Sequence, residues 1–123
     1  MKRISTALVL TMLFTPVFAA ADLGETTYEI ACKNCHAPQF STANKAPAAF
    51  DKEAWADRFK KAEAESKNNP SRYKTAMDYL VYKVKIGKGL MYHGGLCNEA
   101  NVKQKNCSDD AFAAAIRYMS EKK

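Results

Sequence analysis

Apolar residues recur at helical spacing in four stretches of the chain. In the first stretch, Asp22 is the predicted N-cap of a helix that runs into Cys32. Gly24 and Tyr28 stand four residues apart and therefore share one face of that helix. Because glycine has no side chain, we expect another helix to approach closely at Gly24.

The middle of the chain carries two further helical patterns, with a break between them. Asp51 is the predicted N-cap of the first. Its apolar positions are Trp55, Phe59 and Ala62. After the break at residues 68–70, Ser71 is the predicted N-cap of the second helix, which ends at Gly87. Its apolar stripe consists of Tyr73, Met77, Leu80, Val81 and Val84.

The fourth pattern lies at the end of the chain. Ser108 is the predicted N-cap, and two acidic residues follow it at the positive end of the helix dipole. The apolar face consists of Phe112, Ala115, Ile116 and Met119. Residues 37–50 have the composition of a loop, and no segment alternates as a strand does. We therefore predict an all-α fold.

The first residues have the pattern of a secretory signal peptide. Two basic residues precede an apolar run, and small residues favour cleavage after Ala19 over cleavage after Ala21. The run is shorter than a membrane span, so an uncleaved anchor is the weaker interpretation. We predict residues 1–19 to be a cleaved signal peptide and residues 20–123 to be a single domain. After cleavage the protein would not be an integral membrane protein.

Length and charge narrow the possible functions. The 123 residues are enough for one domain with a modest core. The formal net charge is +6, and removal of Lys2 and Arg3 lowers it to +4. Basic residues are not clustered with aromatic ones, so we expect no nucleic-acid partner.

The most informative motif is C-x-x-C-H, formed by residues 32–36. This spacing is the attachment signature of a c-type haem. Cys32 and Cys35 can each add to a vinyl group of one porphyrin, and His36 can bind the iron from the proximal side. We therefore predict one covalently attached haem c as the cofactor, with His36 as a metal ligand.

A haem iron held in this way takes a second axial ligand, and four side chains are candidates. Met77 and Met119 are in phase with apolar helix stripes, so we expect them to pack in the core. Met91 lies in an irregular, glycine-rich stretch after Gly89, where a loop can cover the far side of the haem. Met91 is the favoured distal ligand and His93 is the alternative.

The remaining cysteines, Cys97 and Cys107, are predicted to form a disulfide, because the secretory route leads to an oxidising compartment. This bond would tie the stretch around Met91 to the last helix. An alternative makes the four cysteines a tetrahedral zinc site. The nine residues between Cys97 and Cys107 exceed the usual zinc-knuckle spacing. A thioredoxin-like dithiol would need a βαβ pattern that the sequence lacks.

These features together resemble the class I cytochromes c, and more closely the cytochrome c-five group of small periplasmic electron carriers. The matching segments are Cys32-Lys33-Asn34-Cys35-His36, Ala46-Pro47, Trp55, Gly89-Leu90-Met91, Gly95-Leu96-Cys97 and Cys107-Ser108-Asp109-Asp110. The resemblance implies about four helices around one haem, with the first and last helices crossing.

The resemblance also implies roles for individual residues. Met91 would be the distal ligand, and the backbone carbonyl of Pro47 would accept the ring N–H of His36. Cys97 and Cys107 would be the disulfide of the family. In that family Met-Pro-Pro is frequent where this chain has Met91-Tyr92-His93, so His93 remains an alternative ligand.

The function implied is that of a periplasmic monohaem electron carrier and not of an enzyme. We expect a monomer that docks transiently with a reductase and an oxidase, steered by lysines such as Lys33, Lys45 and Lys88. One alternative is a haem-based ligand- or gas-binding sensor with a labile distal ligand. Another is the electron-accepting subunit of a periplasmic oxidoreductase.

Overall fold

The computed structural model describes residues 18–87, residue 97 and residues 106–121. Its elements are α1 (Phe18–Thr27), the π-helical turn η1 (Tyr28–Cys32), α2 (Lys33–His36), α3 (Pro38–Ser41), α4 (Lys52–Asn68), α5 (Ala76–Ile86) and α6 (Asp109–Glu121). The described residues contain four helices longer than two turns and no strand, so the predicted all-α class is confirmed.

Within the described part of the chain, no helix is both long and apolar enough to cross a bilayer.

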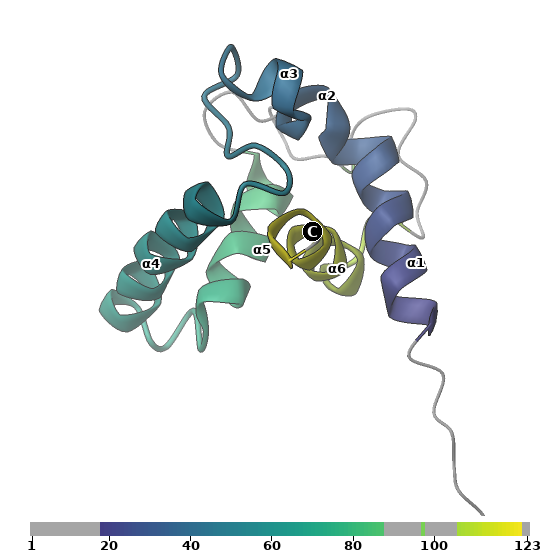
Figure 1. The fold of residues 1–123 in the computed structure, drawn as a ribbon. Helices are drawn as coiled ribbons and strands as arrows, with labels where there is room; N and C mark the ends of the chain where they lie inside the picture. Colours follow the sequence, from purple (N-terminus) through teal and green to yellow (C-terminus); the bar gives the residue numbers. More distant parts are fainter. Residues whose placement is uncertain (1–17, 88–96, 98–105, 122–123) are drawn as a thin grey trace, which may run out of the picture.

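The last helix occupies the centre of the molecule. Figure 1 shows α6 between α1 on one side and the α4–α5 pair on the other, and α6 packs against all three. Its apolar face is buried as predicted, including Phe112, Ile116 and Met119. Tyr28 of η1 and Trp55 of α4 contribute to the same core. The predicted crossing of the first and last helices is therefore confirmed.

The first helix begins earlier than predicted. Asp22 lies inside α1, which starts at Phe18, so its prediction as an N-cap was wrong. Residues 19–21 are all alanine, the strongest helix former, and the helix extends back through them. As predicted, the helical run continues into the cysteines, through η1 to α2. The predicted signal peptide lies almost entirely outside the described residues, because residues 1–17 are among those not described.

Side-chain caps mark the start of α4 and α5. The Asp51 carboxylate accepts a hydrogen bond from the Ala54 N–H at 3.0 Å, which confirms the predicted N-cap of α4. The prediction of Ser71 as the N-cap of α5 was wrong, because the cap is Thr75. Thr75 and Asp78 form a capping box, whereas a cap at Ser71 would place a lysine at the position of Asp78.

The C-terminal end of α5 and the start of α6 agree with the sequence. Gly87 is the C-cap of α5, with φ of 57°, a backbone conformation that favours glycine. The Ser108 hydroxyl accepts a hydrogen bond from the Ala111 N–H at 3.1 Å, as expected of an N-cap. The predicted loop at residues 37–50 is interrupted by the single turn α3, which Pro38 initiates as its first residue.

Candidate haem-attachment site

The two cysteines of the C-x-x-C-H motif are placed at the junction of two helical segments. Cys32 is the last residue of η1 and Cys35 lies one turn further on, in α2. Both are free thiols; Cys32 is buried and Cys35 is half-buried. Burial, with a smaller contribution from the neighbouring Cys35, raises the pKa of the Cys32 thiol to about 12. Neither sulfur is used in a disulfide, so both remain available for thioether formation.

His36 is held in one defined protonation and orientation. Its Nδ1 lies 2.8 Å from the backbone oxygen of Pro47, as the resemblance implies. A carbonyl can only accept, so Nδ1 carries the proton and Nε2 keeps a free lone pair. Burial lowers the pKa of His36, although the hydrogen bond to Pro47 acts in the opposite direction. The side chain thus presents the neutral imidazole that a metal ligand requires.

The backbone loop beneath His36 is fastened to two helices. The Ala49 N–H donates to the His36 carbonyl at 2.6 Å, and the Phe50 N–H donates to the Met119 carbonyl at 2.6 Å. Phe50 has φ of 70°, a left-handed conformation that is uncommon for an aromatic residue. The loop that carries Pro47 is therefore held to α2 and to α6 by its own main chain.

Trp55 of α4 completes the surroundings of His36. Its indole N–H donates to the Ala48 carbonyl at 2.9 Å. Its ring stacks on the imidazole of His36, with 5.7 Å between ring centroids and an interplanar angle of 25°. The sequence placed Trp55 in the core but did not show this role. The sequence could have indicated a hydrogen bond from Trp55, because a buried indole N–H needs an acceptor.

The second pair of cysteines forms the predicted disulfide. Cys97 and Cys107 are joined by an S–S bond of 2.05 Å, with 5.4 Å between their Cα atoms. This bond contradicts the zinc alternative, because it uses two of the four thiolates that zinc would need. No group of three or more metal-binding side chains is found among the described residues. Met91 and His93, the candidate distal ligands, lie outside the described residues.

The residues at this site fit a haem c. Two unpaired thiols stand three positions apart on consecutive turns, and the adjacent neutral imidazole has its free nitrogen directed away from the Pro47 hydrogen bond. Thioether formation needs the thiols, and axial ligation needs the imidazole lone pair. Cys32, Cys35 and His36 are therefore the residues that would hold the group.

Comparison with known families matches residues 19–119 to the family described as cytochrome C oxidase, cbb3-type, subunit III. The chain belongs to this family. It is a monohaem class I cytochrome c family, and its members carry electrons on haem between redox partners. Such cytochrome c domains are typically electron carriers and not catalysts. Comparison with curated proteins and with solved structures gives no match.

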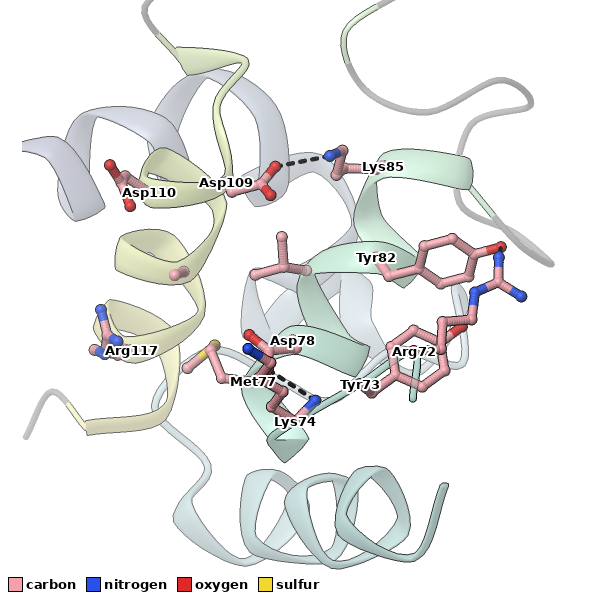
Figure 2. A pocket seen from close by; sticks show the side chains of 12 residues that line it. Arg72, Tyr73, Lys74, Met77, Asp78, Tyr82, Lys85, Asp109, Asp110 and Arg117 are labelled. Atoms are coloured by element: carbon pink, nitrogen blue, oxygen red, sulfur yellow. Dashed lines mark hydrogen bonds and ion pairs between the residues drawn. The ribbon is translucent and has the colours of Figure 1, made fainter. Parts of the chain in front are cut away.

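The cytochrome c domain also has a surface groove that is separate from this site. The groove has a volume of about 560 Å³ and lies between α5 and α6 (Figure 2). Its walls mix basic residues such as Arg72 and Arg117 with acidic ones such as Asp110, and Lys85 is already paired with Asp109 at 2.9 Å. None of the described haem-site residues lines it.

The lysines expected to steer redox partners differ in their surroundings. Lys33 pairs with Glu29 at 2.7 Å on the exposed side of the helical run that carries the cysteines. Its positive charge is therefore partly neutralised at short range. Lys45 is exposed at the end of the turn after α3, and Lys88 lies outside the described residues.

Proposed function

We propose that the protein is a periplasmic one-electron carrier with a single haem c, held by Cys32 and Cys35 and ligated by His36 and Met91. The observation that carries the proposal is the neutral His36 imidazole, hydrogen-bonded through Nδ1 to Pro47 beside two free thiols. Membership of a class I cytochrome c family across residues 19–119 supports it. The likeness to the cytochrome c-five group is part of the proposal.

The residues proposed to hold the haem indicate what the cofactor supplies and what the protein supplies. When bound, the haem supplies an iron that changes oxidation state by one electron. The two cysteines fix the group covalently, and Pro47 orients His36 and keeps its Nδ1 protonated. A neutral sulfur ligand from Met91 favours the reduced state and leaves no position open for a substrate. Fixed ligands of this kind suit electron transfer.

Export to the periplasm is the second part of the proposal. Residues 1–19 form the cleaved signal peptide, and the family match begins at residue 19, which supports a domain that starts at this point. Cleavage after Ala19 would leave Asp22 in the first turn of the shortened helix, where an acidic side chain is favourable. Mass spectrometry of the mature protein from the periplasmic fraction tests both the cleavage and the covalent haem.

The ligand set is tested by the absorption spectrum of the purified ferric protein. A weak far-red band arises from sulfur-to-iron charge transfer, so we expect this band in the unmodified protein. The band should be lost in Met91→Ala and retained in His93→Ala. Its absence from the unmodified protein would contradict Met91 ligation and favour His93 or an open position. Prompt carbon monoxide binding by the native ferrous protein would then support the ligand-binding alternative.

The description of the family favours one further candidate. It names a subunit of an oxidase, which supports a role as the electron-carrying subunit of a larger redox enzyme. Affinity purification of the tagged protein from its native membrane and periplasmic fractions separates the two roles. A subunit should recover a stoichiometric partner with enzymatic activity, whereas a free carrier should be recovered alone.

A further inference from the structure

We propose that Trp55 is a positioning residue for the proximal ligand, acting on both the main chain and the side chain of His36. This inference rests on the proposed ligation of the haem iron by His36. It is carried by four contacts that involve two adjacent peptide groups and the imidazole ring.

The first two contacts hold the peptide group between Ala48 and Ala49 from opposite ends. Its oxygen accepts the indole N–H of Trp55 at 2.9 Å, and its N–H donates to the His36 carbonyl at 2.6 Å. The preceding peptide group supplies the Pro47 oxygen that binds His36 Nδ1 at 2.8 Å. Trp55 therefore anchors the loop segment that forms hydrogen bonds with both the backbone carbonyl and the imidazole ring of His36.

The fourth contact is a ring stack on the imidazole itself. The indole of Trp55 stacks on the ring of His36 at 5.7 Å between centroids and 25° between planes. Rotation of the imidazole out of this plane would separate Nδ1 from the Pro47 oxygen and redirect Nε2. The stack and the loop anchor thus restrain the same orientation of the ligand.

An unfavourable backbone conformation in the loop favours its movement when the hydrogen bond from Trp55 is removed. Phe50, two residues after Ala48, has a positive φ of 70°, a backbone conformation that is unfavourable for a side chain of this size unless the surrounding contacts enforce it. Phe50 is also held by the hydrogen bond from its N–H to the Met119 carbonyl, and its ring contacts the rings of Tyr28 and Tyr118. The Ala48 oxygen also accepts the Asp51 N–H at 3.2 Å. Loss of the indole donor removes the shorter of these two hydrogen bonds, so the Pro47 oxygen is held less firmly relative to His36.

Such a movement has a predictable effect on the iron. A strong hydrogen bond from Nδ1–H makes the imidazole a more basic ligand and favours the oxidised state. Weakening that bond should therefore raise the reduction potential. It should also expose the Nδ1–H to exchange with solvent.

The test compares three variants of the haem-loaded protein. Trp55→Phe keeps an aromatic ring and removes the donor, and replacement of Trp55 by its benzothienyl analogue removes the N–H while keeping size and stacking. Phe59→Leu, one turn further along α4 and partly buried against the core, is the packing control. Hydrogen exchange of the His36 Nδ1–H, followed by NMR in the ferrous state, and the midpoint potential are measured in each.

We expect exchange of the His36 Nδ1–H to become about tenfold faster in both Trp55 variants, which corresponds to loss of roughly one hydrogen bond. The potential should rise in both, and Phe59→Leu should leave both quantities unchanged. Unchanged exchange and potential in the benzothienyl variant would overturn the proposal, even if Trp55→Phe fails to fold. Equal effects from Phe59→Leu would also overturn it, because they would show a general packing effect.

Failure of the proposed function would look different. If His36 is not an iron ligand, the unmodified protein itself will lack the strongly shifted imidazole resonances of a residue bound to haem iron. The Trp55 variants are compared only if the unmodified protein shows these resonances. Failure of His36 ligation is therefore distinguished from failure of the role proposed for Trp55.

Discussion

At the scale of single residues, Gly24 sets how closely α1 and α6 approach. A Cβ atom at this position would lie 2.6 Å from the backbone oxygen of Ala114 and 3.2 Å from Cβ of Tyr118. The first atom belongs to the backbone of a packed helix and cannot easily move. The absence of a side chain at Gly24 is therefore a requirement of the crossing, as the sequence pattern suggested.

Replacing Gly24 by alanine separates this requirement from helix propensity. Propensity alone predicts that Gly24→Ala stabilises the helix by about 1 kcal/mol. Because of the close approach, we expect the free energy of unfolding to fall by about 1–3 kcal/mol instead. Guanidinium unfolding of the haem-loaded protein measures it. Ala64→Gly on the exposed face of α4 is the control that gives the propensity effect alone, and stabilisation by Gly24→Ala would contradict the close crossing.

A second residue-scale feature is a polar pair inside the core. Thr27 and Asn106 are fully buried, and the amide Nδ2 of Asn106 donates to the Thr27 hydroxyl at 3.0 Å. Within the part of the chain that the structure describes, Asn106 Oδ1 has no partner. The pair joins α1 to the residue before Cys107, and so links the cysteine-bearing helical run to the disulfide.

We expect Thr27→Val to lower the free energy of unfolding by about 1–3 kcal/mol, because it keeps the shape and leaves the Asn106 amide without its acceptor. Chemical denaturation of Thr27→Val, Asn106→Ala and the double variant measures the coupling. The two single effects should not add, since the second substitution removes a partner that is already lost. Strict additivity would show that the hydrogen bond contributes nothing.

At the scale of elements, the start of α5 depends on one capping box. The Thr75 hydroxyl accepts from the Asp78 N–H at 3.1 Å, and the Asp78 carboxylate accepts from the Thr75 N–H at 2.9 Å. Tyr73, expected within the helix, is instead buried ahead of it in a turn closed by Asn69. The helix therefore begins four residues later than a cap at Ser71 predicts.

The two candidate caps make a matched pair of variants. Thr75→Ala should lower the free energy of unfolding by about 1 kcal/mol, the usual contribution of an N-cap. Ser71→Ala, at an exposed position before the helix, should leave it unchanged. Thermal unfolding followed by circular dichroism compares them. A larger loss from Ser71→Ala than from Thr75→Ala would restore the earlier helix start.

The same elements show which features a sequence can predict. Asp51 and Ser108 were predictable as caps because a cap needs only its own side chain and the next few backbone N–H groups. Choosing between Ser71 and Thr75 requires the residue three positions on, which is lysine after Ser71 and aspartate after Thr75. The π-helical turn η1 was not predicted, because the apolar pattern of the sequence does not distinguish a single π-helical turn from a continuous α-helix.

Contacts across the loop were harder to predict than the helices. The C-x-x-C-H motif identified Cys32, Cys35 and His36, and the family resemblance implied the Pro47 contact that the structure contains. The hydrogen bond from Trp55 to Ala48 spans seven residues across a turn, and no periodicity encodes such a pairing. The distal ligand stays a prediction, because Met91 and His93 lie outside the described residues.

At the scale of the whole molecule, the start of α6 is the point where several elements are joined. Cys107 binds Cys97 across a separation of ten residues, Asn106 binds Thr27 of α1, and Asp109 pairs with Lys85 of α5. Cys97 lies six residues after the proposed ligand Met91, so the disulfide ties the chain that follows Met91 to the start of α6. We therefore expect the disulfide to affect both global stability and the retention of the distal ligand.

The decisive variant is Cys97→Ser/Cys107→Ser, which removes the bond without leaving a free thiol. Its short loop predicts a loss of about 3 kcal/mol in the free energy of unfolding. Lys85→Ala is the control, since it removes only an exposed ion pair of at most about 1 kcal/mol at the same junction.

Guanidinium unfolding followed both by helix content and by the far-red iron–sulfur band measures the two consequences together. Because the segment around Met91 loses its anchor, the band should disappear at a lower denaturant concentration than the helices, whereas in Lys85→Ala the two transitions should coincide. Coincident transitions in the double serine variant would show that the disulfide stabilises the fold as a whole and does not retain the ligand.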